Sequence, residues 1–215
     1  YVHHQPNGTP YSCASQLSKS IINAANTAGI NLTLLPVLYM TAGFDGQPLL
    51  EEQKRFGNSV ARYIDIQNDA AQYCADQSQH NVGIALHSLR AVPAEPMSEV
   101  INYFANNSSV CPIHIHISEQ TQEVEQSIAS LKKRPVEWLL DNHTVDQQWC
   151  LIHATHMTPQ ETEALARSGA TVGICPTTEA NLGDGLFPLR NYLDHGGHIA
   201  IGSDGNTCTN PMEEL

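Results

Sequence analysis

Short apolar runs alternate with longer amphipathic segments along this 215-residue chain, and this alternation limits its possible folds more than any other feature. The runs are rich in β-branched residues and are short enough for buried strands, whereas the segments between them have helical periodicity. Nearly continuous apolar strands separated by helices are typical of a parallel sheet that is covered on both faces. The predicted strands span residues 32–39, 82–88, 112–118, 149–155, 170–175 and 198–204.

The segments between the strands carry recognisable helix ends. Thr158 followed by Pro159 and Glu161 is typical of a helix start, and Gly169 is typical of a helix end. We find no internal repeat beyond the alternation and no linker. The predicted helices span residues 15–28, 53–77, 96–106, 121–130, 135–141, 159–168 and 187–195, and residues 178–188 form a loop.

Polar residues stand at the same end of several predicted strands. His87, His116 with Glu119, His153 and Asp204 all follow or close a strand. Because the carboxyl ends of parallel strands form one rim, we expect these side chains to lie together although they are far apart in the sequence. Groups drawn from several strand ends fit a (β/α)₈ barrel better than the single crevice of an open sheet.

The run "CPIHIHISEQ" holds two histidines on one side of a strand, because residues two apart face the same way. His116 is nearer the carboxyl end, so we predict it as a metal ligand and His114 as a hydrogen-bonded core residue. The alternative is that both are structural. In "LIHATH", His153 closes the strand and is the predicted functional residue, whereas His156 falls in the next loop.

An aspartate after a strand is often only a turn former. Asp204 follows the last predicted strand, with histidines on earlier strands, which favours a ligand or a general base. Catalytic zinc takes nitrogen and oxygen ligands, and a neighbouring carboxylate can move protons. His116 and Asp204 are too few to hold zinc alone, so a further ligand must come from another residue or from a preceding segment.

The motifs "HIHISEQ", "LIHATH", "TEANLGDG" and "IGSD" together resemble the amidohydrolase superfamily. With "YVHHQPNGTPY", "LTLLPVLY" and "HSLRAV", the resemblance covers essentially the whole chain and is closest to the deiminases of N-formimino-L-glutamate in histidine degradation. It implies a (β/α)₈ barrel, flanked by a small β-domain, with one Zn²⁺ held by a strand-1 HxH pair, a strand-5 histidine and a strand-8 aspartate. Residues 1–215 would then be a partial barrel domain with strands 3–8, and "YVHH" would be the tail of strand 2.

The same resemblance implies roles for the strand-end residues. His116 would be the strand-5 zinc ligand, and Asp204 the strand-8 ligand and proton acceptor. Glu119 would pass a proton to the departing nitrogen, and His153 would either polarise the attacked group or hold the hydroxide. The implied reaction is hydrolysis of N-formimino-L-glutamate to N-formyl-L-glutamate and ammonia.

Tyr1, His87 and Arg90 match positions with which the family holds its substrate. The substrate that the resemblance implies would be a small dicarboxylate, whereas the chain has a formal charge of −12, so a local cation would be needed. Arg90 can bind a carboxylate through two hydrogen bonds. The ordinary alternative is a surface arginine after a strand.

The chain departs from the family pattern in two places. The strand-1 HxH pair is absent, and "GNTCTN" follows Asp204 where Ser-His is expected. Strand 4 ends in Leu86 and His87 with no lysine to bridge two metals, which favours one zinc ion. The alternatives are a related deaminase of an aminated ring, of the guanine or adenosine type, or a catalytically incompetent fragment.

The charge and hydropathy of the chain exclude several partners. It has 10 Lys and Arg against 22 Asp and Glu, with no basic block, which argues against nucleic acid and anionic membranes. No apolar run approaches the roughly 20 residues that span a bilayer, and no signal peptide is evident, so we expect a cytoplasmic protein. The scattered cysteines are predicted to be reduced.

Both ends of the chain look internal to a longer protein. It starts at Tyr1 without methionine, and Thr209 or Asn210 before Pro211 has the pattern of a helix start. An open barrel would leave strand edges and apolar surface exposed. We therefore expect missing strands to come from a partner chain, as in a homo-oligomer, or the protein to be poorly soluble.

Overall fold

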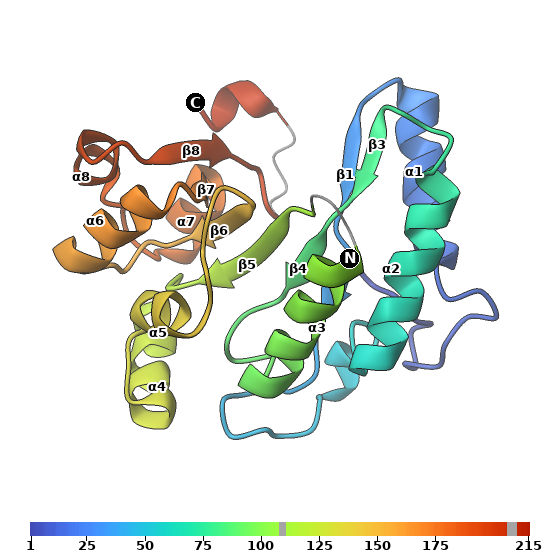
Figure 1. Ribbon diagram of the computed structural model, residues 1–215, viewed down its shortest axis with the longest axis horizontal. Coiled ribbons are helices and arrows are strands. Elements are labelled where there is room, and N and C mark those ends of the chain that lie inside the picture. The colour runs from blue at the N-terminus through green and yellow to red at the C-terminus, as the bar shows by residue number, and fades with distance from the viewer. Residues whose placement is uncertain (108–110, 206–209) are drawn as a thin grey trace. The chain divides into compact units, whose positions relative to one another are not determined.

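The computed structural model describes residues 1–107, 111–205 and 210–215, and the chain divides into two compact units, Tyr1–His114 and Ile115–Leu215. Helices and parallel strands alternate in both units, as the sequence predicts (Figure 1). None of the helices in the described ranges has the length and apolarity needed to cross a bilayer. The cysteines in these ranges are free thiols, as predicted, and Cys208 lies outside them.

The first unit contains two pairs of parallel strands and the helices that accompany them. β1 pairs with β3, and β2 pairs with β4. Figure 1 shows α1 and α2 side by side, next to β1 and β3. Its elements are α1 (Gln16–Ala28), β1 (Leu32–Leu34), β2 (Val37–Leu38), η1 (Glu51–Gln53), α2 (Val60–Cys74), β3 (His80–Val82), β4 (Ile84–Leu86) and α3 (Ala94–Asn107).

The core between α1, α2 and β1 is apolar. Ile22 of α1 and Leu34 of β1 pack with Ala70 and Cys74 of α2, and all four are buried. Burying such side chains stabilises a fold by about 1.5–3 kcal/mol for each large aliphatic residue. This contact fixes the two helices against the strand.

Two predicted elements of the first unit have different bounds in the structure. Residues 32–39 form two strands, because Pro36 has no N–H to donate and its carbonyl accepts from the Tyr63 hydroxyl at 3.2 Å. The predicted helix at residues 53–77 starts only at α2, where the Ser59 side chain caps the Arg62 N–H at 3.2 Å.

The tetrapeptide "YVHH" is not a strand tail. The N–H groups of His3 and His4 donate to the same carbonyl, that of Arg55, at 2.8 and 3.1 Å. Two bonds to one loop carbonyl replace the strand ladder that was predicted. The segment is also joined to β2, because the His3 Nε2 atom lies 3.1 Å from both the N–H nitrogen and the carbonyl oxygen of Val37.

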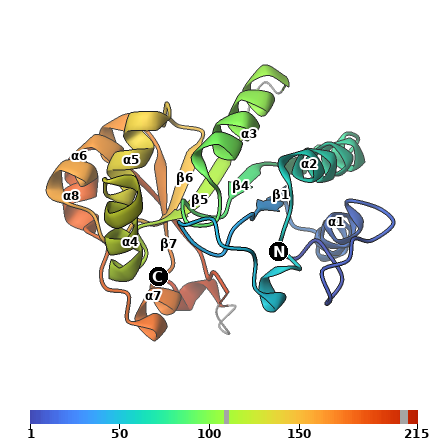
Figure 2. The ribbon, with the colours of Figure 1, turned by 90° about the horizontal axis from the view of Figure 1, so that it is seen from below.

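The second unit carries strands in the order β5-β6-β7-β8, with β6, β7 and β8 parallel to one another. Figure 2 shows α4, α5 and α6 together on one side of β5, β6 and β7. β5 begins at the boundary between the units. The elements are β5 (Ile113–Ile117), α4 (Thr121–Leu131), α5 (Pro135–Asn142), β6 (Trp149–His153), α6 (Pro159–Ser168), β7 (Thr171–Ile174), α7 (Pro176–Leu182), α8 (Leu189–Asp194), β8 (His198–Ile201) and η2 (Pro211–Glu213).

The predicted ends of α6 are confirmed. Thr158 and Glu161 form a capping box, and Gly169 ends the helix with φ 83°. At the other predicted helix start, the Asn210 side chain caps the Met212 N–H at 3.1 Å, whereas Thr209 lies outside the described residues. The local signals were therefore sufficient at these ends.

One helix of the second unit was missed. Residues 178–188 were predicted as a loop, but α7 covers the first part of that segment. Pro176 occupies the first helical turn, and Gly183 ends the helix in the left-handed conformation with φ 71°. A helix of seven residues is too short to show a helical period in the sequence.

All four residues of β8 are exposed, and the two isoleucines, Ile199 and Ile201, have relative exposures of 36% and 40%. This matches the expectation of exposed apolar surface on a strand of this chain.

Candidate active site

The ends of β5, β6 and β8 bring four predicted site residues together in the second unit. His153 closes β6, and its ring stacks on that of His116 with centroids 5.7 Å apart. The Nε2 atom of His153 lies 3.7 Å from Glu119 Oε1 and 4.0 Å from Asp204 Oδ2. Two carboxylates from different strand ends therefore face the same ring nitrogen.

The other ring nitrogen of His153 faces a residue that was not predicted. Nδ1 lies 3.2 Å from Oε1 of Glu179, on α7. His153 is 1% exposed and Glu179 is 6% exposed. Burial, the largest influence, lowers the pKa of His153, but the bond to Glu179 and the charges of Glu119 and Asp204 outweigh it, so the pKa is raised.

The backbone at these strand ends is strained. Ser118 after β5, His153 and Ala154 at the end of β6, and Asp204 after β8 have φ values of 52°, 70°, 48° and 50°. A residue other than glycine in this left-handed region costs roughly 1–3 kcal/mol, and such residues cluster at functional sites. The strain falls at three of the strand ends that carry the predicted catalytic groups.

Glu123 of α4 holds the turn that carries Glu119. Its two carboxylate oxygens accept hydrogen bonds from the N–H groups of Ser118 and Glu119, each at 3.0 Å. Ser118 is fully buried and Glu123 is 8% exposed. A buried carboxylate that binds two backbone donors therefore fixes the strained turn and the direction in which Glu119 leaves it.

The donor set around His153 Nε2 suits zinc. Imidazole nitrogen and carboxylate oxygen are zinc's usual ligands, and His116 and Asp204 supply one of each. Asp204 faces Nε2 of His153, on whose ring that of His116 stacks. The residues present therefore fit part of a zinc site, and we keep these two as the predicted ligands.

A second group, of His153, Cys175 and Glu179, also has its ligand atoms within 4.8 Å of one another. Burial, with added repulsion from nearby carboxylates, raises the pKa of Cys175 to about 12. Glu179 Oε1 already accepts the Cys175 N–H at 2.9 Å, so we interpret this group as a hydrogen-bonded support for His153.

The predicted substrate residues His87 and Arg90 follow β4 in the first unit. The His87 ring makes an edge contact with that of Tyr39, with centroids 4.4 Å apart, and its Nδ1 lies 3.0 Å from the Ser88 hydroxyl. Arg90 is close enough to lower the pKa of Tyr39, although burial, the larger influence, leaves that pKa raised. Tyr39 therefore contacts His87 and lies within electrostatic range of Arg90.

Tyr1 takes part in the core packing of the first unit. Its ring packs against the apolar cluster between α1, α2 and β1, and its hydroxyl lies 2.7 Å from that of Ser18. Burial raises the pKa of the Tyr1 phenol above its ordinary value. A substrate role for Tyr1 stays a prediction.

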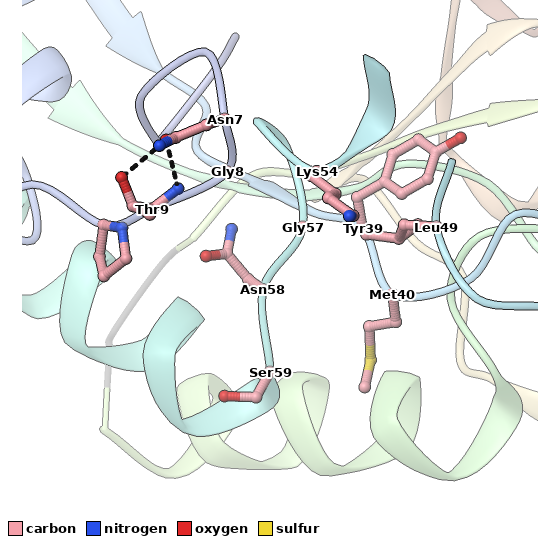
Figure 3. Close-up of a pocket in the computed structure, with 11 residues that line it drawn as sticks. Asn7, Gly8, Thr9, Tyr39, Met40, Leu49, Lys54, Gly57, Asn58 and Ser59 are labelled. Atoms are coloured by element: carbon pink, nitrogen blue, oxygen red, sulfur yellow. Dashed lines mark hydrogen bonds between the residues drawn. The ribbon is translucent and has the colours of Figure 1, made fainter. Parts of the chain in front are cut away.

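A cavity of about 500 Å³ also lies in the first unit (Figure 3). It is lined by loop residues that include Asn7, Lys54 and Asn58, and by Tyr39. Asn7 Oδ1 accepts from the N–H and the hydroxyl of Thr9 at 3.0 and 2.7 Å, so its oxygen is already satisfied within the loop. None of the predicted hydrolytic residues is in the described lining of this cavity.

A family model described as the amidohydrolase family matches residues 15–215. The chain belongs to the amidohydrolase family. Over all of its 215 residues it is 46% identical to the formimidoylglutamate deiminase of Pseudomonas aeruginosa and covers 47% of that protein. Over 127 residues it is 33% identical to a 5-methylthioadenosine/S-adenosylhomocysteine deaminase of Halobacterium salinarum, of which it covers 29%. The chain thus spans about half or less of these curated relatives, and the predicted resemblance is confirmed.

Solved structures of amidohydrolases give the same fold. A crystal structure of an amidohydrolase from Brucella melitensis matches the whole chain with a TM-score of 0.94 at 44% identity, and the chain covers 47% of it. An adenosine deaminase from Xanthomonas campestris, solved with bound zinc, matches 93% of the chain with a TM-score of 0.73 at 20% identity, which supports the fold alone, and the chain covers 43% of it. The predicted fold class, part of an amidohydrolase (β/α)₈ barrel, is confirmed.

Sequence reasoning missed three residues of these clusters. Glu179 was placed in a loop, where a substrate contact and loop-stabilising hydrogen bonds were both left open, and it was kept out of the catalytic set. Glu123 was given no role, and Tyr39 closed a predicted strand. A signal for Glu123 was available, since it lies four residues after Glu119 in the first turn of α4. Glu179 and Tyr39 act through contacts between elements, which no local pattern reveals.

Proposed function

We propose that the protein of which this chain is a part hydrolyses N-formimino-L-glutamate to N-formyl-L-glutamate and ammonia. The observation that carries the proposal is the pair of carboxylates, Glu119 and Asp204, facing Nε2 of the buried His153. The identity of 46% to a formimidoylglutamate deiminase over the whole chain supports the same substrate.

Each residue of the cluster has a separate task in this reaction. Asp204 accepts a proton from the attacking water, and Glu119 delivers a proton to the nitrogen that leaves as ammonia. His153 Nε2 faces both carboxylates and accepts a hydrogen bond from the attacking water. A zinc ion, when held by His116 and Asp204 with ligands from outside this chain, supplies Lewis-acid polarisation.

The substrate carboxylates need cations in a chain of charge −12. We assign Arg90, with His87, to this task, because an arginine can bind a carboxylate through two hydrogen bonds. Tyr1 is retained as the third predicted substrate residue.

The test is a substrate comparison with the purified full-length protein loaded with zinc. We expect ammonia and N-formyl-L-glutamate to be released in equal amounts from N-formimino-L-glutamate. The zinc content of the same sample is measured, so that a lack of activity is not caused by a lack of zinc. A zinc-loaded protein that releases no ammonia from this substrate would refute the proposal.

A second candidate is deamination of an aminated ring. The 33% identity to a 5-methylthioadenosine/S-adenosylhomocysteine deaminase favours it, but over only 59% of the chain. Release of ammonia from 5-methylthioadenosine or S-adenosylhomocysteine, and not from N-formimino-L-glutamate, would support this candidate.

A further inference from the structure

Glu179 is the only carboxylate that a described contact places within hydrogen-bond distance of the Nδ1 side of His153. Its Oε1 lies 3.2 Å from Nδ1 and accepts the Cys175 N–H at 2.9 Å. The Glu179 N–H in turn donates to the Cys175 carbonyl at 2.9 Å. Two hydrogen bonds thus hold this buried oxygen, and a third holds the backbone of Glu179 that carries it.

An ionised carboxylate can only accept hydrogen bonds, so Nδ1 must carry the proton in this contact. In neutral His153 the lone pair is then on Nε2, the atom that faces Glu119 and Asp204. Histidines in functional sites commonly have their tautomer set by such a partner on the other nitrogen.

We propose that Glu179 is a positioning residue, which holds His153 in the Nδ1–H tautomer and aims Nε2 at the reacting group. This rests on the proposed function only in so far as His153 acts in that reaction. The contact with Glu179 at 3.2 Å holds the ring of a side chain that is 1% exposed.

The test compares three single-residue variants of the full-length protein. Glu179→Met removes the acceptor and keeps the side-chain volume, whereas Glu179→Gln keeps an oxygen that can accept from Nδ1. Glu161→Met is the matched control, because Glu161 is equally buried at 6% exposure in the same unit and bonds Arg134 Nε at 2.7 Å.

The main readout is the ¹⁵N spectrum of the histidine rings without substrate, recorded above the titration midpoint of His153 and assigned with His153→Gln. We expect the Nδ1–H pattern in the parent, in Glu179→Gln and in Glu161→Met, and a shift toward Nε2–H in Glu179→Met. An Nε2–H pattern in the parent, or an unchanged pattern in Glu179→Met, would overturn the proposal.

A kinetic readout links the tautomer to turnover. Loss of a supporting carboxylate of this type typically costs 10- to 100-fold in activity, so we expect kcat to fall by roughly that factor in Glu179→Met with a smaller change in KM. Glu179→Gln should recover most of the loss. Because the spectrum needs no substrate, failure of the proposed reaction and failure of the tautomer assignment are told apart.

Discussion

Replacing Glu123 with alanine should both destabilise the protein and slow its reaction. Glu123 is the buried acceptor for the N–H groups of Ser118 and Glu119, each at 3.0 Å. Ser118 is fully buried, so its donor cannot turn to bulk water when the carboxylate is removed. The strained turn at Ser118, with φ 52°, would also lose its anchor.

The cost follows from the two hydrogen bonds. A hydrogen bond to a charged group contributes about 1.5–3 kcal/mol, and an unsatisfied buried donor costs about 1–3 kcal/mol. Water that enters the space left by the side chain recovers part of this, so we expect Glu123→Ala to lower the free energy of unfolding by about 2–4 kcal/mol. Glu123→Gln, which keeps one acceptor, should lose about half as much.

Urea-induced unfolding followed by circular dichroism measures this change, and ammonia release measures the effect on turnover. We expect kcat to fall by roughly 10- to 100-fold, because a misplacement of about 1 Å at a catalytic group has an effect of that size. Glu125→Ala, at an exposed position on the same helix, should change stability by less than about 0.5 kcal/mol. If Glu123→Ala were as stable as Glu125→Ala, the anchoring role would be wrong.

Three further predictions concern substrate choice, metal binding and alkaline stability. Arg90→Met should reduce kcat/KM for N-formimino-L-glutamate at least tenfold more than for any ring substrate, and an equal loss for both would contradict the carboxylate assignment. His116→Ala should lower the zinc content of the dialysed protein, measured by atomic absorption, whereas unchanged content would remove His116 from the ligand set. Burial raises the pKa of Tyr192 to about 12 from 10.0, so the stabilisation from its neutral hydroxyl, which donates to the Ala170 carbonyl at 2.8 Å, is complete below pH 10 and is lost as the pH rises to 12. Urea unfolding at pH 9 and 11 should therefore show a smaller decline for Tyr192→Phe than for the parent, and equal declines would refute this.

The strand ends that carry His153 and Asp204 could be predicted because the apolar runs show where each strand stops. His153 closes β6, and Asp204 follows β8, where the apolar runs of the sequence end. Parallel strands then bring these ends to one rim, whatever the loops do. The contacts of His153 with Glu119 and Asp204 are the result.

The parts that could not be predicted depend on contacts between elements. Glu179 faces His153 from α7, a helix that is too short to show a helical period in the sequence. Gly183 and Gly185, which follow this helix, made the segment look like a loop. Pro36 breaks an apolar run, and the partners that β1 and β2 then take, β3 and β4, are not visible in the local pattern. Such features depend on partners that a local pattern does not contain.

The most direct test of the central claim is the ammonia release of Glu119→Gln in the zinc-loaded, full-length protein. Glutamine keeps the size of the side chain that faces His153 Nε2 at 3.7 Å but cannot transfer the proton. We predict that kcat falls by roughly 10²- to 10⁴-fold, as for loss of a general acid–base group, while the zinc content stays that of the parent. Parental turnover in this variant would contradict the account.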